Sequence, residues 1–250
     1  MASINLNHIL IFIDLDDTIF QTIRKNPNAK IPATESPNHL TVSYMSQEQN
    51  LFLGLLNANE TALIIPVTAR DYDQYKRTFI SREDKIAYAS IFFGAEILHK
   101  HESDVLWKSH VKSKLMSLSL KVADLKPVIE RRLNAELYNI YNVNDYYLVI
   151  KHKDKSNYCE YNKSCFNMLK ELIPYDYSYF INDNNITIVP KCIDKKNAVE
   201  YLIDKIKPKL TIGIGDSMSD WNFMDLCDFK IIPKNSQINR VINNNLFNYD

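Results

Sequence analysis

The sequence predicts an α/β fold, in which a Rossmann-like, doubly wound parallel sheet forms the core and an α+β cap domain is inserted into it. Apolar runs typical of strands buried on both faces alternate with helical patterns near both ends of the chain. Acidic or hydroxyl side chains follow several of these runs directly. Between the two ends, residues 98–185 change to polar helices and tyrosine-rich strands. We therefore expect a core of residues 1–97 and 186–250, interrupted by an inserted domain of residues 98–185.

The composition is that of an ordinary globular protein. The chain has 250 residues, 46% of them hydrophobic, and its 30 basic residues balance its 30 acidic ones. A neutral chain without a dense basic patch favours neither a nucleic-acid partner nor a membrane partner. The 4 cysteines form no CxxC pair, and no signal peptide is recognisable, so the expected compartment is the cytoplasm. The oligomeric state does not follow from these observations.

The first half of the core has the order strand, helix, strand. Residues 8–13 form an apolar run that predicts a buried strand, whereas residues 21–44 are polar and rich in proline, which predicts an irregular segment. The sequence SQEQ at residues 46–49 is a capping box and predicts a helix of about three turns. A parallel strand at 62–67, a helix at 72–78 and a third core strand at 89–95 are expected to follow.

The inserted domain and the second half of the core continue this pattern. In the insertion we expect helices at 104–119, 126–138 and 161–172, and strands at 146–151 and 178–182. After it we expect a core strand at 186–189, a helix at 196–206, and strands at 210–214 and 229–232. The insertion therefore separates the third core strand from the fourth.

Polar side chains gather where the predicted strands end or the predicted helices begin. Asp14 and Asp16 follow the first strand, Thr68 follows the second, Lys195 begins a helix, and Asp216 follows a late strand. In a parallel sheet these positions share one edge. Converging carboxylates repel one another unless a cation holds them, and a few hard oxygen ligands favour Mg²⁺. The metal in turn attracts a phosphate, whose remaining oxygens suit Lys195 and Thr68.

Four short motifs occur in a fixed order along the core. They are DLDDT at residues 14–18, Thr68, Lys195, and GDSMSD at residues 215–220. This ordered set resembles the haloacid dehalogenase (HAD) superfamily of phosphatases. An insertion between the second and third motifs is similar to the C2B-type cap of the Cof-type and sucrose-phosphatase-like members. The resemblance implies an Mg²⁺-dependent phosphomonoester hydrolase that acts on a small phosphorylated metabolite, and we expect a sugar or polyol phosphate.

The resemblance also implies a role for each residue of the motifs. Asp14 would be the nucleophile that forms an aspartyl-phosphate, and Asp16 the general acid and base. Thr68 and Lys195 would hold the transferred phosphoryl group. The Mg²⁺ ligands would be Asp14, Asp16 through its backbone carbonyl, and Asp216, while Asp220 would orient Lys195 or a metal-bound water.

Five further residues are candidates for substrate binding. Three lie in the core, namely Thr18, Ala69 and Arg70, and two in the inserted cap, Lys151 and His152. Arg70 also has a simpler interpretation, because it could pair with Asp71 or Asp73 on the surface.

The chain departs from the subgroup's usual pattern at three positions. Asp17 stands where the subgroup usually has Gly, Lys196 where Gly often follows the lysine, and Ser219 where Asn is commoner. None of these changes removes a reacting group. Lys196 leaves two lysines to choose from, and we prefer Lys195.

Two other functions remain open at this stage. A phosphomannomutase-like phosphotransferase would share the motifs and this kind of cap, but it would release little free phosphate. A catalytically silent regulatory or binding protein would keep the fold, yet it would not require both carboxylates of the first motif, Asp14 and Asp16.

Overall fold

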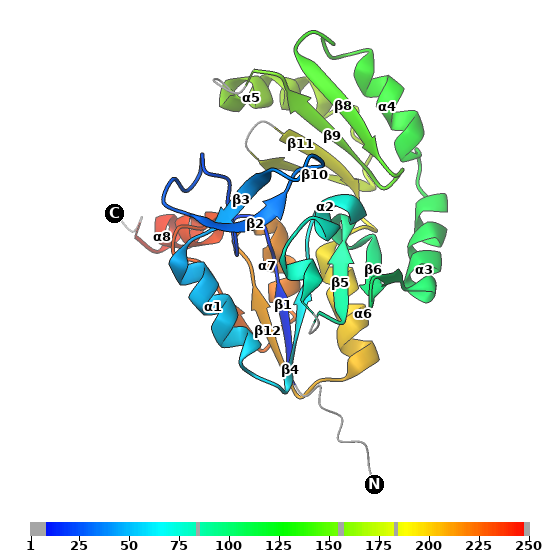
Figure 1. Cartoon of the computed structure of the whole chain (residues 1–250). Helices are drawn as coiled ribbons and strands as arrows, with labels where there is room; N and C mark the ends of the chain where they lie inside the picture. The colour runs from blue at the N-terminus through cyan, green and yellow to red at the C-terminus, as the bar shows by residue number, and fades with distance from the viewer. Residues whose placement is uncertain (1–8, 84–85, 155–157, 183–184, 248–250) are drawn as a thin grey trace. The chain divides into compact units, whose positions relative to one another are not determined.

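The computed structural model describes residues 9–83, 86–154, 158–182 and 185–247, and the chain divides into two compact units (Figure 1). Unit 1 comprises Met1–Val105 and Asp194–Asp250, and unit 2 comprises Leu106–Ile193. The chain thus passes between the units after residues 105 and 193, later than the expected boundaries after 97 and 185. In the described part of the chain, no helix combines the length and the hydropathy needed to cross a bilayer.

A four-stranded parallel sheet with the order β13-β12-β1-β4 forms the centre of unit 1. Its strands are β1 (Ile9–Ile13), β4 (Ala62–Pro66), β12 (Leu210–Ile214) and β13 (Phe229–Ile231). Strand β1 pairs with β12 on one side and with β4 on the other. Leu10, Phe12 and Ile13 are fully buried, which explains the uninterrupted apolar run of this central strand. The parallel core predicted from the sequence is confirmed.

The helices of unit 1 are α1 (Gln47–Asn57), α2 (Tyr72–Lys76), α6 (Lys195–Ile206), α7 (Met218–Met224) and α8 (Gln237–Phe247). The expected capping box begins α1, because the Ser46 side chain accepts a hydrogen bond from the Gln49 amide at 3.2 Å. Helices α1 and α6 lie to either side of the parallel strands in Figure 1. The β1, α1, β4 order is the parallel crossover unit that the sequence predicts.

Two smaller sheets of unit 1 differ from the prediction. The segment expected to be irregular contains an antiparallel hairpin of β2 (Ile31–Glu35) and β3 (Thr41–Met45). The expected third core strand is β5 (Tyr88–Ile91), which ends in a 3-10 turn at Phe92–Gly94. Strand β5 pairs antiparallel with β6 (Glu96–His99), and β6 pairs with β7 (Glu102–Ser103). Only the bridge between Val67 and Ser90 continues the parallel pairing to β5 within the described residues.

Unit 2 contains an antiparallel sheet with the order β10-β11-β9-β8. Its strands are β8 (Tyr138–Val143), β9 (Tyr147–His152), β10 (Tyr177–Asn182) and β11 (Asn185–Pro190). The helices are α3 (Val105–Met116), whose first residue still belongs to unit 1, α4 (Val122–Glu130) and α5 (Tyr158–Leu169). A core of buried side chains from the sheet, α4 and α5 includes Leu125, Ile129, Leu148, Leu169 and Ile186.

Two expectations for this region are wrong. Residues 186–189 do form a strand, but this strand, β11, pairs antiparallel with β9 and β10 instead of joining the parallel core. The helix expected over 126–138 ends at Glu130, and strand β8 begins at Tyr138. An apolar run such as that of β11 has the same pattern in either kind of sheet, so the sequence did not distinguish them.

Both passages between the units are attached to helix α6. Before the first passage, the buried Asp104 carboxylate accepts hydrogen bonds from the Tyr201 hydroxyl at 3.2 Å and from the Lys205 ammonium at 2.6 Å. After the second passage, Asp194 is the N-cap of α6, and its side chain accepts from the Lys196 amide at 2.8 Å. Helix α6 therefore anchors the chain just before and just after unit 2 in the sequence.

Candidate active site

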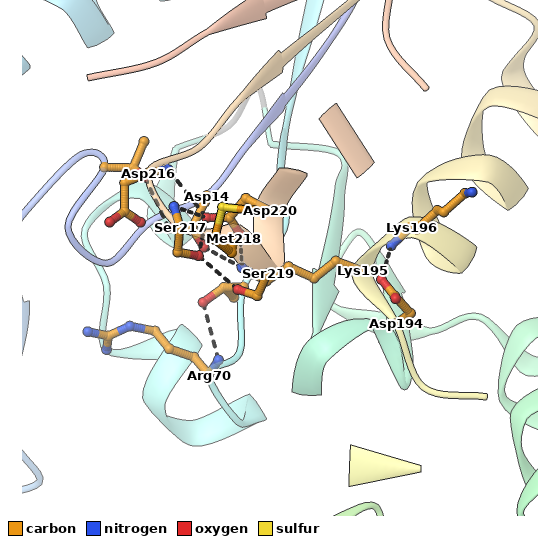
Figure 2. A network of polar contacts seen from close by, with 12 residues as sticks. Asp14, Arg70, Asp194, Lys195, Lys196, Asp216, Ser217, Met218, Ser219 and Asp220 are labelled. Carbon is orange, nitrogen blue, oxygen red and sulfur yellow. Dashed lines mark hydrogen bonds and ion pairs between the residues drawn. The ribbon is translucent and has the colours of Figure 1, made fainter. Parts of the chain in front are cut away.

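The ends of two neighbouring parallel strands bring three aspartates together (Figure 2). The Asp14 amide donates to the Ile214 carbonyl at 2.8 Å, which extends the pairing of β1 with β12 by one residue. Asp216 follows β12, and Asp220 lies in the first turn of α7. One carboxylate oxygen from each of Asp14, Asp216 and Asp220 lies within 4.8 Å of the other two. We call these three residues the aspartate cluster.

The buried ammonium of Lys195 joins two members of the aspartate cluster. Its Nζ donates to Oδ1 of Asp14 and to Oδ1 of Asp220, at 2.6 Å in each case. Burial disfavours the charge on Lys195, but the two carboxylates outweigh it and raise the pKa above its ordinary value. Lys196 is exposed and points away from the cluster in Figure 2. Of the two candidate lysines, the structure therefore brings Lys195 to the site.

Asp220 is held on both carboxylate oxygens. While Oδ1 accepts from Lys195, Oδ2 accepts from the Ser217 hydroxyl at 2.7 Å, the Ser217 amide at 3.0 Å and the Asp216 amide at 3.3 Å. A Cβ on Gly215 would lie 2.5 Å from the Cβ of Asp220, so this close approach requires glycine. Asp220 is thus fixed in a position that orients Lys195.

The aspartate cluster carries more negative than positive charge. Burial, followed by the charges of Asp220 and Asp216, raises the pKa of Asp14 above its usual range, although Lys195 opposes this shift. Burial, with the nearby charges of Asp220 and Asp17, raises the pKa of Asp216 to about 7. Among the described residues, none donates a hydrogen bond to the Asp216 carboxylate. Such a set of oxygen donors fits a divalent cation such as Mg²⁺, which would relieve the repulsion.

Asp16 lies outside the aspartate cluster and pairs with Arg70. The guanidinium donates from Nε to Oδ2 and from Nη2 to Oδ1 of Asp16, both at 2.8 Å. Arg70 therefore pairs with Asp16 and not with Asp71 or Asp73, the surface partners that the sequence also allowed. Asp71 instead accepts a hydrogen bond from the Gln74 amide as the N-cap of α2. With its carboxylate engaged in this way, Asp16 keeps only its backbone carbonyl for the metal role expected of it.

The remaining core candidates surround these groups. Thr18 is buried and donates its hydroxyl to Oδ2 of Asp14 at 3.1 Å, so it positions the Asp14 carboxylate. Thr68 is buried beyond the end of β4, and its hydroxyl oxygen accepts from the Arg70 amide at 3.2 Å. Ala69, which lies between Thr68 and Arg70 in the sequence, is half-buried. Thr18 therefore holds the Asp14 side chain, and Thr68 holds the backbone at Arg70.

The two cap candidates belong to unit 2 and differ in exposure. Lys151 is half-buried on β9. The side chain of His152 is 2% exposed, stacks on the Tyr161 ring at 4.0 Å between centroids and meets the edge of Tyr138. This core position does not fit the substrate-binding role expected of His152. The alternation of side chains along a strand directs the two neighbours to opposite faces of the sheet.

Sequence reasoning missed one contributor to the site, Ser217, and noted another, Asp17, only as a departure from the usual glycine. Ser217 anchors Asp220, and the spacing Ser217-x-x-Asp220 at a helix start is a capping pattern that would have revealed it. Asp17 pairs with Lys25 and has a φ of 64°, in the left-handed region that glycine adopts most easily. The positive φ of Asp17 thus explains why glycine is usual at this position in the subgroup that the sequence resembles.

Comparisons of the sequence with known proteins match only part of the chain. No protein-family model matches the chain. A phosphoglycolate phosphatase from Staphylothermus marinus is 26% identical over 103 residues, so the match spans 39% of this chain and 42% of that relative. Both shares are well under two thirds.

Similar solved structures cover nearly the whole chain. Sucrose-phosphatase from Synechocystis, solved with sucrose and phosphate, has a TM-score of 0.59 at 16% identity and covers 96% of this chain and 88% of its own. The C-terminal domain of C. albicans trehalose-6-phosphate phosphatase has a TM-score of 0.57 at 19% identity, covering 88% and 75%. A haloacid dehalogenase-like hydrolase from B. subtilis has a TM-score of 0.51 at 15% identity, covering 93% and 92%. The chain has the fold of the HAD phosphatases, as its motifs predict.

Proposed function

We propose that the chain is an Mg²⁺-dependent phosphomonoester hydrolase that acts on a small phosphorylated metabolite through an aspartyl-phosphate. The observation that carries the proposal is the buried Lys195, which joins Asp14 to Asp220 beside Asp216. An ammonium among three carboxylates suits a site that receives a metal ion together with an anionic phosphate. The fold shared with phosphatases supports the same reaction class.

In the first step, Asp14 attacks the phosphate ester. A carboxylate oxygen of Asp14 forms a bond to phosphorus, the bond between phosphorus and the ester oxygen breaks, and the phosphoryl group passes to Asp14. Asp16 gives its proton to the departing oxygen, which leaves as an alcohol. Lys195 fixes the Asp14 carboxylate and offers its charge to the phosphoryl oxygens, while Thr68 offers its hydroxyl.

In the second step, water restores the enzyme. Asp16, now a carboxylate, takes a proton from a water molecule whose oxygen attacks the phosphorus of the aspartyl-phosphate. The bond between phosphorus and Asp14 breaks, and inorganic phosphate is released. Mg²⁺, held by Asp14, Asp216 and the backbone carbonyl of Asp16, would neutralise charge on the phosphoryl group.

The substrate class rests on the relatives. Two of the similar structures are phosphatases of sucrose and trehalose phosphates, which supports a sugar phosphate, with polyol phosphates as near neighbours in chemistry. Within unit 2, Lys151 stays our candidate for a residue that selects among substrates. The neutral composition supports a small-molecule substrate over a nucleic acid, and we propose the cytoplasm as the compartment.

The substitution Asp14→Asn tests this function, because an amide of nearly the same shape cannot act as the nucleophile. We expect the folded variant to release free phosphate at background rate from a panel of glucose, fructose, sucrose, trehalose and glycerol phosphates. Wild-type protein should lose activity in EDTA and regain it with Mg²⁺. Asp225→Asn, which alters an exposed pair with Lys230, is the control and should behave as wild type.

Three outcomes would contradict the proposal. If Asp14→Asn keeps more than about a tenth of the wild-type turnover, the activation free energy has risen by less than about 1.4 kcal/mol, and Asp14 is not the nucleophile. Isomerised sugar phosphate with little free phosphate would indicate a phosphotransferase. Mg²⁺ binding without turnover on any ester would indicate a silent binding protein.

A further inference from the structure

The contact between Arg70 and Asp16 fixes the orientation of a side chain that is otherwise open to solvent. Asp16 has 52% of its side chain exposed and lies in the loop after β1. Each of its carboxylate oxygens accepts one hydrogen bond from the Arg70 fork at 2.8 Å. Two parallel bonds from one planar group set both the place and the plane of a carboxylate. A single lysine contact would set neither.

Arg70 is itself held from three other sides. Its Nη1 donates to the Gln74 carbonyl at 3.3 Å, its guanidinium lies over the Phe20 ring at 5.1 Å, and its amide donates to the Thr68 hydroxyl. The Arg70 side chain is only 15% exposed. In this pair the anchored, shielded partner is the arginine, so Arg70 dictates where Asp16 points.

The same contacts argue against direct binding of phosphate by Arg70. Each of the three guanidinium nitrogens of Arg70 already donates to a protein oxygen, two to Asp16 and one to Gln74. A phosphate ligand would have to replace part of the fork that orders Asp16. By contrast, Lys195 lies directly against Asp14.

We propose that Arg70 is a positioning residue for Asp16, and this inference rests on the proposed function. An acid must lie within hydrogen-bonding reach of the oxygen that it protonates. An exposed aspartate on a loop would adopt several rotamers, and the Arg70 fork selects one. Arg70 therefore contributes to the reaction only through proton transfer by Asp16. This positioning role replaces the substrate-binding role that the sequence suggested.

The departing group of the ester distinguishes these two roles. A sugar oxygen is a poor leaving group and needs a proton from Asp16, whereas p-nitrophenolate departs without one. The ratio kcat/KM reports the steps up to departure of the alcohol, so it excludes the later use of Asp16 as a base. Loss of a positioned acid therefore lowers kcat/KM for the sugar phosphate alone. Loss of a phosphate ligand lowers it for both esters alike.

The experiment measures kcat/KM for Arg70→Ala, Asp16→Asn and the double variant, with p-nitrophenyl phosphate and with the best sugar phosphate of the panel. We expect Arg70→Ala to lose on the order of 100-fold on the sugar phosphate and less than about 5-fold on the aryl ester. The double variant should lose no more than Asp16→Asn alone, because both changes remove one function. Added guanidinium ion should restore Arg70→Ala but not the double variant.

A matched control and a second variant accompany this test. Arg82 makes contacts of the same kind away from the site, with Glu35 at 3.0 Å and over the Phe79 ring at 4.9 Å, so Arg82→Ala should keep wild-type kinetics. If Arg70→Ala fails to fold, Arg70→Lys keeps the charge without the fork and should show the same dependence on the ester.

Two results would overturn the inference, and they are distinguishable from each other. Equal losses on both esters, additive with those of Asp16→Asn, would make Arg70 a substrate ligand while leaving the proposed function intact. A wild-type chain that releases phosphate from neither ester would remove the proposed function, and the role of Arg70 with it.

Discussion

Asp220 and Asp16 are both paired with a cation, yet their surroundings assign them different tasks. Asp220 has no exposed surface and has bonds to both carboxylate oxygens, whereas half of the Asp16 side chain faces solvent. A buried, fully bonded carboxylate cannot move during a reaction without breaking several contacts. Asp220 is therefore suited to hold Lys195 still, and Asp16 to exchange protons with substrate and water.

Replacing Asp220 should affect stability and turnover together. Asp220→Asn removes the charge that faces the buried Lys195 and leaves an amide group among donors, so we expect unfolding to become easier by about 1–3 kcal/mol. Turnover should fall at least about 10-fold because Lys195 loses its orientation. Chemical denaturation and phosphate release measure the two effects. Ser219→Ala, whose hydroxyl contacts the Ser217 hydroxyl alone within the described part of the chain, should change little, and an equally large loss there would refute the assignment.

At the residue scale, the sequence predicted the cluster better than the contacts around it. Asp14, Lys195, Asp216 and Asp220 follow from strand ends and motif order, because parallel strands bring those ends to one edge. The pairing of Arg70 with Asp16 could not be predicted, since the two are 54 residues apart and nearer aspartates were equally plausible partners.

At the scale of elements, strands were easier to predict than their partners. The apolar run of β11 indicated a strand, but its partner β9 and the helices whose buried core it shares lie elsewhere in the sequence. The hairpin of β2 and β3 was missed because its polar sequence contains Pro32, a residue usually confined to edge strands. The burial of His152 was not predicted for a related reason, because it depends on Tyr161 of α5, which stacks on its ring.

Two glycines allow a direct test of how the start of α6 is placed. Gly94 has a φ of 97°, and a Cβ there would lie 2.5 Å from the carbonyl oxygen of Asp194, the N-cap that precedes Lys195. Gly94→Ala should therefore destabilise the fold by about 1–3 kcal/mol and reduce turnover. Gly54 in α1 has open space around it, so Gly54→Ala should stabilise the fold by about 0.5–1 kcal/mol with unchanged turnover. Denaturant melts and phosphate release measure both, and similar effects of the two changes would disprove the argument.

At the scale of the whole molecule, the groups of the proposed chemistry all lie in unit 1. The sequence predicted the inserted unit from a change in pattern, but its boundaries lie earlier than those of unit 2, the second one because β11 has the pattern of a core strand. A chain organised in this way can change its substrate preference without changing its reaction, provided that selection rests with unit 2.

Lys151 offers a test of that division. Lys151→Ala should lower kcat/KM for the preferred sugar phosphate about 10-fold and for p-nitrophenyl phosphate less than about 2-fold, because only binding of the sugar is weakened. Lys153→Ala is the control, since the ammonium of this exposed residue bonds only to the Ala135 carbonyl among the described residues. Proportional losses on both esters after Lys151→Ala would show that Lys151 does not select substrate.

The attachment of both chain passages to helix α6 has a practical meaning for domain recombination. Asp104, with Tyr201 and Lys205, secures one side of the insertion, and Asp194 secures the other at the first turn of the same helix. Val105 and Asp194 are therefore natural graft junctions. A foreign module spliced between them would inherit both anchors and leave every strand of the parallel sheet in its original sequence context.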